Sequence, residues 1–323
     1  MTDQGRRRTD TDSGGPALVA VAHGSRDPGA LRTANALLDR VRALRPDLDV
    51  RLGNIEMDRP ALPETLAQLR GEAVLVPLLL GRGHHVKHDI PRLLATAGGH
   101  LRARIAAPLG PHPLLAEALH ARLIEAGWPG EAAGAHATET ARATETARAT
   151  DAGCATDAGC AAEAARSTDT ARATDTVHST DAERAPDAAL STDTARSLAV
   201  VLAAAGSRDP ASAADTRRTA RLLSARLGGV PVVPAYASAA SPTVPDALRA
   251  LAARGRHRVA IASYFTAPGR FAAQCAARAP WVAAAPLGAH PAMAELVLRR
   301  YAQELAPHAA LRDPRADPAL ARV

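Results

Sequence analysis

The sequence predicts an α/β protein built from two homologous halves, each a parallel β-sheet with helices on its faces. Two observations carry this prediction: short apolar runs alternate with segments of helical periodicity, and several motifs occur twice in the same order. Composition supports it, because 47% of the 323 residues are hydrophobic while only 2% are aromatic. A core made of Ala, Val and Leu suits helices packed closely on a parallel sheet rather than a β-sandwich.

Within the first 130 residues, each apolar run reads as a buried strand and each following segment has apolar residues at helical spacing. The expected strand and helix pairs are 17–22 with 30–44, 50–55 with 61–69, 74–80 with 90–97, and 101–106 with 114–124. Such short connections require a parallel sheet with helices as crossovers. Ligands in these sheets bind beyond the carboxyl ends of the strands, so residues at strand ends are the candidates for a site.

Three motifs of the first half return in the second half in the same order. HGSRDP at 23–28 returns as AGSRDP at 205–210, the prolines at 60 and 63 return at 242 and 245, and APLGPHP at 107–113 returns as APLGAHP at 285–291. This order indicates a duplication. We therefore predict two domains, residues 16–130 and 197–308, with a disordered N-terminal tail at 1–15 and a C-terminal tail at 309–323.

Residues 131–196 differ from both halves in composition. They consist of Ala, Thr, Asp, Glu and Arg in imperfect repeats such as ATETAR and ATDAGC. They have no apolar face, so they bury too little surface to offset the entropy of ordering. We predict a low-complexity linker, with a fluctuating Ala-rich helix as the alternative. Cys154 and Cys160 fall here and Cys275 is isolated, which indicates neither a disulfide framework nor a Cys-x-x-Cys metal pair.

Several function classes are disfavoured. The formal charge of +6 forms no sustained basic stripe and no aromatic residue interleaves with a basic run, which disfavours nucleic acid as a partner. The apolar run at 17–22 is too short for a signal peptide or a membrane span, so we expect a cytoplasmic protein without membrane contact. HGSRDPG is neither a dinucleotide fingerprint nor a phosphate-binding loop, so the fold does not imply NAD or ATP.

A candidate metal site consists of His23, Glu56 and His85, which follow the first three predicted strands. Two imidazoles and a carboxylate suit borderline divalent metals such as iron, cobalt, nickel or zinc. Without a thiolate, tight structural zinc is disfavoured. Each residue alone also has a simpler interpretation, as a turn cap, as the partner of an arginine, or as one of several exposed loop histidines.

The second half provides an internal comparison for these three residues. The corresponding positions hold Ala205, Ser238 and Phe271, although the surrounding motifs persist. A residue that the fold needs should have been needed in both copies, so the difference favours one active site per chain. His112 and His290, by contrast, occur in both halves and are interpreted as helix-start or packing residues.

Together, the HGSRDP, GNIEMDRP, VPLLLGRGHHVKHDIP and APLGPHP segments resemble the sirohydrochlorin cobaltochelatase and ferrochelatase family. These segments cover most of residues 17–118, and the resemblance is weaker over residues 198–298. The duplication resembles the family's long form, in which two fused halves mimic the homodimer of short archaeal members. The resemblance implies a class II chelatase fold, two flavodoxin-like or Rossmann-like halves around a cleft for a tetrapyrrole, in a chain that acts as a monomer.

The resemblance also implies roles for single residues. His23 would be a metal ligand and proton acceptor, His85 the second metal ligand, and Glu56 a contact of substrate or metal. His84 and His88 are additional histidines that could assist or replace His85. The remaining predicted substrate contacts form two groups. A loop would line the macrocycle, and it consists of Leu80, Gly81, Arg82, Gly83 and His84. Cations would pair with the carboxylates of the macrocycle, solvated surface cations being the alternative, and these are Arg26, Arg82, Lys87 and Arg92.

The expected function is a lyase that inserts Fe²⁺ or Co²⁺ into sirohydrochlorin, in sirohaem or cobalamin biosynthesis. Histidine can accept the pyrrole protons at neutral pH, and an open ligand set lets the metal leave. The metal is then a substrate, and no tightly bound cofactor is expected. The alternatives are a non-catalytic carrier of divalent metal based on GHHVKH, and a metal-dependent hydrolase that uses the same three residues. These ligand types suit iron and cobalt equally.

Overall fold

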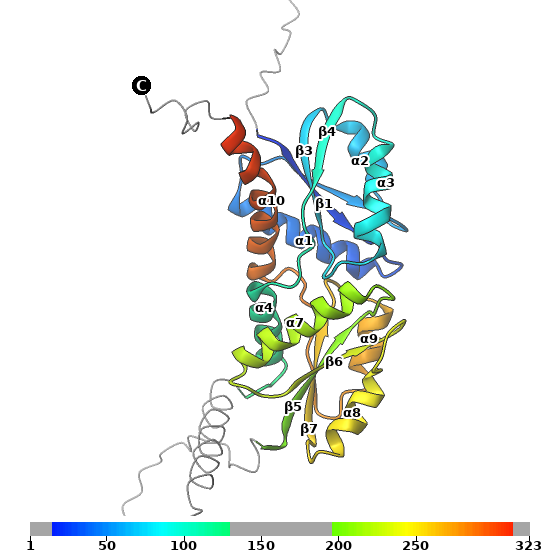
Figure 1. The fold of residues 1–323 in the computed structure, drawn as a ribbon, viewed down its shortest axis with the longest axis vertical. Helices are drawn as coiled ribbons and strands as arrows, with labels where there is room; N and C mark the ends of the chain where they lie inside the picture. Colours follow the sequence, from blue (N-terminus) through cyan, green and yellow to red (C-terminus); the bar gives the residue numbers. More distant parts are fainter. Residues whose placement is uncertain (1–14, 130–195, 313–323) are drawn as a thin grey trace, which may run out of the picture.

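A computed structural model describes residues 15–129 and 196–312, which form two α/β halves stacked end to end (Figure 1). Both tails and residues 130–195, with nearly all of the predicted linker and its two cysteines, lie outside the described residues. The predicted fold class, two parallel sheets flanked by helices, is confirmed. Within the described ranges, no helix is long and apolar enough to cross a membrane.

The first half follows the predicted alternation. Its strands are parallel, in the order β2-β1-β3-β4. A five-residue π-helix, η1 (His85–Asp89), precedes α3 and was not predicted. The elements are β1 (Ala17–Ala22), α1 (Pro28–Leu44), β2 (Val50–Asn54), α2 (Leu62–Gln68), β3 (Gly71–Pro77), η1, α3 (Ile90–Ala95), β4 (Leu101–Ile105) and α4 (Pro113–Glu125).

The second half repeats this topology, with strand order β6-β5-β7-β8. The registers agree as well, because Leu18 pairs with Val50 where Val200 pairs with Val232. The elements are β5 (Leu198–Ala204), α7 (Pro210–Arg226), β6 (Val232–Tyr236), α8 (Val244–Ala252), β7 (Arg258–Tyr264), α9 (Arg270–Ala276), β8 (Val282–Ala283) and α10 (Pro291–Arg312). The last helix thus continues past residue 308, where we expected the domain to end.

Alternating side chains of the central strand β1 divide between two cores. Leu18 and Ala20 face a core shared with α1, while Val19 and Val21 face a smaller core beneath α2 and α3. All four are fully buried. The first sheet is therefore covered on both faces, as a parallel sheet of apolar strands requires.

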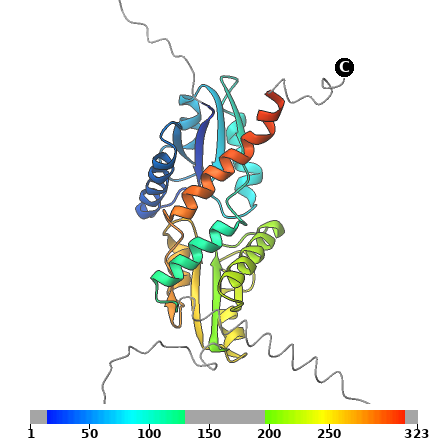
Figure 2. The same cartoon turned by 90° about the vertical axis from the view of Figure 1, so that its left-hand side faces the viewer.

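The last helix of each half packs on the opposite half. The helix α4 lies against α7 and β7, whereas α10 lies against α1 and β3 (Figures 1 and 2). Arg122 of α4 donates from Nη2 to the carbonyl oxygen of Leu287 at 3.1 Å. Arg300 of α10 donates equivalently to Leu109 at 2.9 Å. One apolar core runs through both halves as a result, so the exchanged helices hold the two halves in a fixed arrangement.

His112 and His290 begin these two helices. The Nδ1 atom of His112 accepts the backbone N–H of Leu114 at 3.1 Å, and Nδ1 of His290 accepts that of Ala292 at 3.2 Å. The interpretation of both as helix-start residues is confirmed.

Candidate active site between the two halves

The carboxyl ends of β1 and β2 place His23 and Glu56 next to each other. The backbone N–H of Glu56 donates to the carbonyl oxygen of His23 at 3.0 Å. Gly24 permits this approach, because it has φ +91° and a Cβ there would lie 1.7 Å from the carbonyl oxygen of Glu56. In the second half, the N–H of Ser238 donates to Ala205 at 3.0 Å. The structure therefore supports the correspondence between these positions.

The π-helix η1 brings His85 against His23. Their ring centroids lie 4.4 Å apart with an angle of 81° between the rings. His84 and His88 instead face each other at 4.8 Å, and the His84 ring is 6.4 Å from that of His85. His85 is thus the loop histidine that the structure pairs with His23.

Asp89 orients His85 and was missed in the sequence. Its Oδ2 lies 2.7 Å from Nδ1 of His85. When Nδ1–H donates to this carboxylate, Nε2 keeps a lone pair for a metal or a proton. Burial raises the pKa of Asp89, but the hydrogen bond from His85 and the charges of His85, His84 and Arg92 outweigh it and leave this pKa below its usual value. The H-x-x-x-D spacing on a helical segment was the available signal.

Glu56 is less closely associated with the pair. Its side chain is exposed. Among the described residues, no three His, Cys, Asp or Glu side chains lie close enough together to hold a metal ion. The structure therefore unites two of the three predicted ligands and places the third beside them through its backbone.

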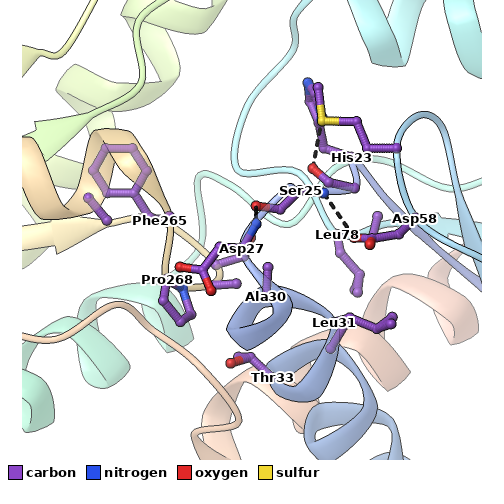
Figure 3. A pocket seen from close by; sticks show the side chains of 18 of the residues that line it. His23, Ser25, Asp27, Ala30, Leu31, Thr33, Asp58, Leu78, Phe265 and Pro268 are labelled. Carbon is purple, nitrogen blue, oxygen red and sulfur yellow. Dashed lines mark hydrogen bonds between the residues drawn. The ribbon is translucent and has the colours of Figure 1, made fainter.

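A cavity of about 830 Å³ opens between the halves beside His23 (Figure 3). One wall comes from the end of β1 and the start of α1, and the opposite wall from residues 265–272 of the second half. Its lining is mainly apolar, and it includes both phenylalanines of the chain, Phe265 and Phe271. Arg26 and Arg270 also line it.

The turn after β1 is braced by the hydrogen bonds drawn in Figure 3. The N–H of Ser25 donates to Oδ2 of Asp58 at 2.9 Å, and Ser25 Oγ accepts from the N–H of Asp27 at 3.0 Å. Asp27 in turn caps α1 by accepting the N–H of Gly29. These contacts give Ser25 a structural role in the turn that begins at His23.

The predicted substrate cations are distributed differently from the expectation. Arg26 lines the cavity, but Arg82 forms an ion pair with Asp215 at 2.7 Å and Lys87 pairs with Asp209. These two partners lie on the second half, 133 and 122 residues further along the chain, so sequence proximity gave no sign of them.

The same ion pairs draw the predicted macrocycle loop against α7. Residues 80–84 are not among those that line the cavity, where Leu78 and Leu79 are found instead. Arg92, the last predicted cation, lies 3.2 Å from Asp89. The contacts of these residues with a substrate stay a prediction.

The fold and the site together define a class: a duplicated α/β protein with one histidine pair at a cleft between its halves. Comparison with known proteins gives the family. The CbiX family model matches residues 17–126 and 199–304, one match in each half. The chain therefore belongs to the CbiX family, and the predicted relation to the sirohydrochlorin chelatases is confirmed.

Two relatives match about a quarter to a third of the chain. The sirohydrochlorin cobaltochelatase of Methanococcoides burtonii is 28% identical over 123 residues, which cover 33% of this chain and 94% of that protein. The sirohydrochlorin cobaltochelatase of Methanothermobacter thermautotrophicus is 34% identical over 86 residues, which cover 25% of this chain and 59% of that protein.

Solved structures match both halves. SirB from Bacillus subtilis with Fe³⁺ has a TM-score of 0.59 and 19% identity, over 91% of this chain and 97% of its own. CbiX, described as the terminal enzyme of sirohaem biosynthesis in denitrifying bacteria, has a TM-score of 0.54 and 19% identity, over 89% and 98%. These likenesses show a shared fold.

Proposed function

We propose that this protein inserts Fe²⁺ or Co²⁺ into sirohydrochlorin, in the synthesis of sirohaem or a cobalamin. One observation carries the proposal: the contact between His23 and His85 exists in one half beside an open cavity, while the second half has Ala205 and Phe271 instead. A cavity of about 830 Å³ falls in the range of small-molecule sites. The names of the relatives supply the substrate.

The two histidines divide the chemistry between them. His85, oriented by Asp89, presents Nε2 as a metal ligand. His23 has Nδ1 3.2 Å from the carbonyl oxygen of Gly24. The tautomer that donates there leaves Nε2 to accept one pyrrole proton, and water takes the other. Such a sparse set of protein ligands leaves most of the metal's coordination shell to water, so the ion can pass to the macrocycle.

Glu56 completes the site as a contact of metal or substrate. Its backbone is anchored to His23, and its exposed side chain can turn toward the histidines when a divalent cation arrives. A carboxylate also lowers the cost of bringing a double charge next to two neutral imidazoles.

The cavity walls match a flat, conjugated ring with peripheral carboxylates. Phe265 and Phe271 provide aromatic surface for the ring. Arg26 and Arg270 provide planar cations for carboxylates. Substrate binding thus uses both halves, although the metal ligands come from the first.

A direct assay tests this function. Purified protein is mixed with sirohydrochlorin and with Fe²⁺, Co²⁺ or Ni²⁺ in turn, and the absorption of the macrocycle is followed. We expect faster insertion of Fe²⁺ or Co²⁺ than in the uncatalysed reaction, and a loss of about 10²–10⁴-fold in His23→Ala. The exposed His257 of the second half provides a matched control, His257→Ala. An uncatalysed rate with every metal would refute the proposal.

A metal carrier is the second candidate, favoured by the His84 and His88 rings that face each other at 4.8 Å. It predicts metal binding that survives His23→Ala and no affinity for sirohydrochlorin. The hydrolase gains no support, because the described residues contain no group of three side chains that could hold a metal ion.

A further inference from the structure

The duplication gives the molecule two equivalent interfaces between its halves. At one, the start of α1 faces the Phe271 segment, residues 264–275, and the cavity lies there. At the other, the start of α7 faces the His85 segment, residues 78–89, which runs from the end of β3 through η1. Gly81 of this segment lies beside α7, where a Cβ would be in ordinary van der Waals contact with Ser212 Oγ at 3.5 Å.

A buried carboxylate closes the second interface. Asp215 has a side chain only 4% exposed. It accepts three hydrogen bonds from Arg82: from Nη2 at 2.7 Å, from Nε at 3.0 Å and from the backbone N–H at 3.1 Å. Two parallel hydrogen bonds from a guanidinium with a third from the backbone fix the residue in both position and orientation.

Two further contacts hold the same segment on either side of Arg82. Asp209 pairs with Lys87 while capping α7 through the N–H of Ala211 at 2.9 Å. The pKa of Asp209 is lowered mainly by the hydrogen bond with Lys87 and, to a smaller extent, by the hydrogen bond from Ala211. Tyr264, whose pKa burial raises, donates its hydroxyl to the carbonyl oxygen of Leu80 at 2.9 Å.

The cavity interface has no counterpart of these pairs. The paired registers of β1 with β3 and of β5 with β7 align Val74 with Ala260. The same alignment places Pro268 at the position of Arg82 and Ala273 at that of Lys87, and the registers of β1 and β5 place Thr33 at that of Asp215. The ion pairs therefore exist only where the facing segment carries a metal-ligand histidine.

We propose that Asp209 and Asp215 are positioning residues, by which the second half holds the His85 segment so that His85 meets His23. Gly81 and Gly83 would leave this segment pliable without such restraint. The second half lost its own ligands but kept the GSRDP motif. The proposal gives Asp209 of that motif a role, which is to hold the His85 segment through Lys87. The kinetic part of this inference rests on the proposed chelatase function.

Asparagine substitutions test the proposal because they keep side-chain size, and asparagine also remains an effective helix cap at position 209. Hydrogen exchange of residues 80–89 should become about tenfold faster in Asp209→Asn/Asp215→Asn, with residues 198–204 unchanged. The chelation kcat should fall about tenfold with little change in the KM for sirohydrochlorin. Asp39→Asn, which breaks an exposed ion pair on α1, is the matched control.

A double-mutant cycle separates positioning from substrate binding. If Arg82 acts through Asp215, then Arg82→Gln/Asp215→Asn is no slower than either single variant. A raised KM in Arg82→Gln alone would instead make Arg82 a substrate contact and overturn the proposal. Unchanged exchange at 80–89, or equally faster exchange at 198–204, would overturn it too. An inactive wild type would refute the chelatase function, while the exchange data would still decide whether the carboxylates hold the segment.

Discussion

Single residues show how far the sequence predicts the site. His23 and His85 could be predicted because strand ends of a parallel sheet converge and the second half lacks both. The carboxylate of Glu56 could not be placed, since the strand end fixes its backbone and leaves its side chain exposed. From the sequence, Arg82 is a candidate substrate cation, and its ion pair with Asp215 cannot be predicted because the two residues are distant in the chain. A sequence pattern therefore predicts a position that backbone topology sets, but it does not reveal a tertiary contact such as that of Arg82 with Asp215.

Asp89→Asn tests the orientation of His85. The amide keeps the shape of the carboxylate but loses its charge, so it holds Nδ1–H of His85 less firmly. We expect metal affinity or chelation rate to fall about 10–100-fold, as for other carboxylates that orient a metal-binding histidine. Spectroscopic titration with Co²⁺ and the chelation assay measure this. Asp47→Asn, at an exposed ion pair with Arg45, is the control; equal affinity and rate in both variants would remove Asp89 from the site.

At the scale of elements, the predicted strands and helices are those observed, with shifted ends. The helix α1 begins at Pro28, before the expected residue 30, because Asp27 caps it. The π-helix η1 was missed because the apolar spacing that predicts α3 begins only at Ile90. Helical periodicity detects a buried face, and η1 contains no buried residue.

Two helix starts make stability depend on pH. Burial, followed by the charges of nearby arginines, lowers the pKa of His112 and His290 below 6.5, against opposing glutamates. As the pH falls, the two histidines are therefore protonated in the unfolded chain before they are protonated in the folded protein. The stability that these two neutral histidines contribute is fully present above the pKa of histidine in the unfolded chain. It is lost as the pH falls from that pKa through the lower pKa of the folded state. The charged neighbours are Arg299, Arg300 and Glu295 for His112, and Arg40, Arg122, Glu117 and Glu125 for His290.

His112→Asn/His290→Asn isolates this effect, because asparagine caps a helix without titrating near neutral pH. The free energy of unfolding, from urea titrations at about pH 7 and pH 5, should fall less in the variant than in the wild type. Equal losses would assign the acid sensitivity to other groups.

For the whole molecule, duplication was readable in the sequence but the exchange of α4 and α10 was not. Periodicity specifies which face of a helix is apolar, whereas the two sheets are equivalent and offer similar surfaces. Contacts such as Arg122 with Leu287 decide the arrangement. Because each half packs its last helix on the other, we expect the halves to move as one unit, which fits the proposed division between a half with metal ligands and a half that supports them.

Leu119→Ala tests the coupling of the halves. Leu119 lies on α4, is 1% exposed and belongs to the core that runs through both halves. The substitution should cost about 2–5 kcal/mol and should speed hydrogen exchange in both β1 and β5. Leu44→Ala, at a residue 56% exposed, is the control. Faster exchange confined to one half would show that the halves unfold separately.

The central claim is that one histidine pair, in the first half, performs metal insertion. The most direct test compares single-turnover insertion of Co²⁺ into sirohydrochlorin by the wild type and by His85→Phe, which places the residue of the second half at this position. The account predicts rapid insertion by the wild type and a rate close to the uncatalysed reaction for His85→Phe, with unchanged folding by circular dichroism. Wild-type rates in His85→Phe would contradict it.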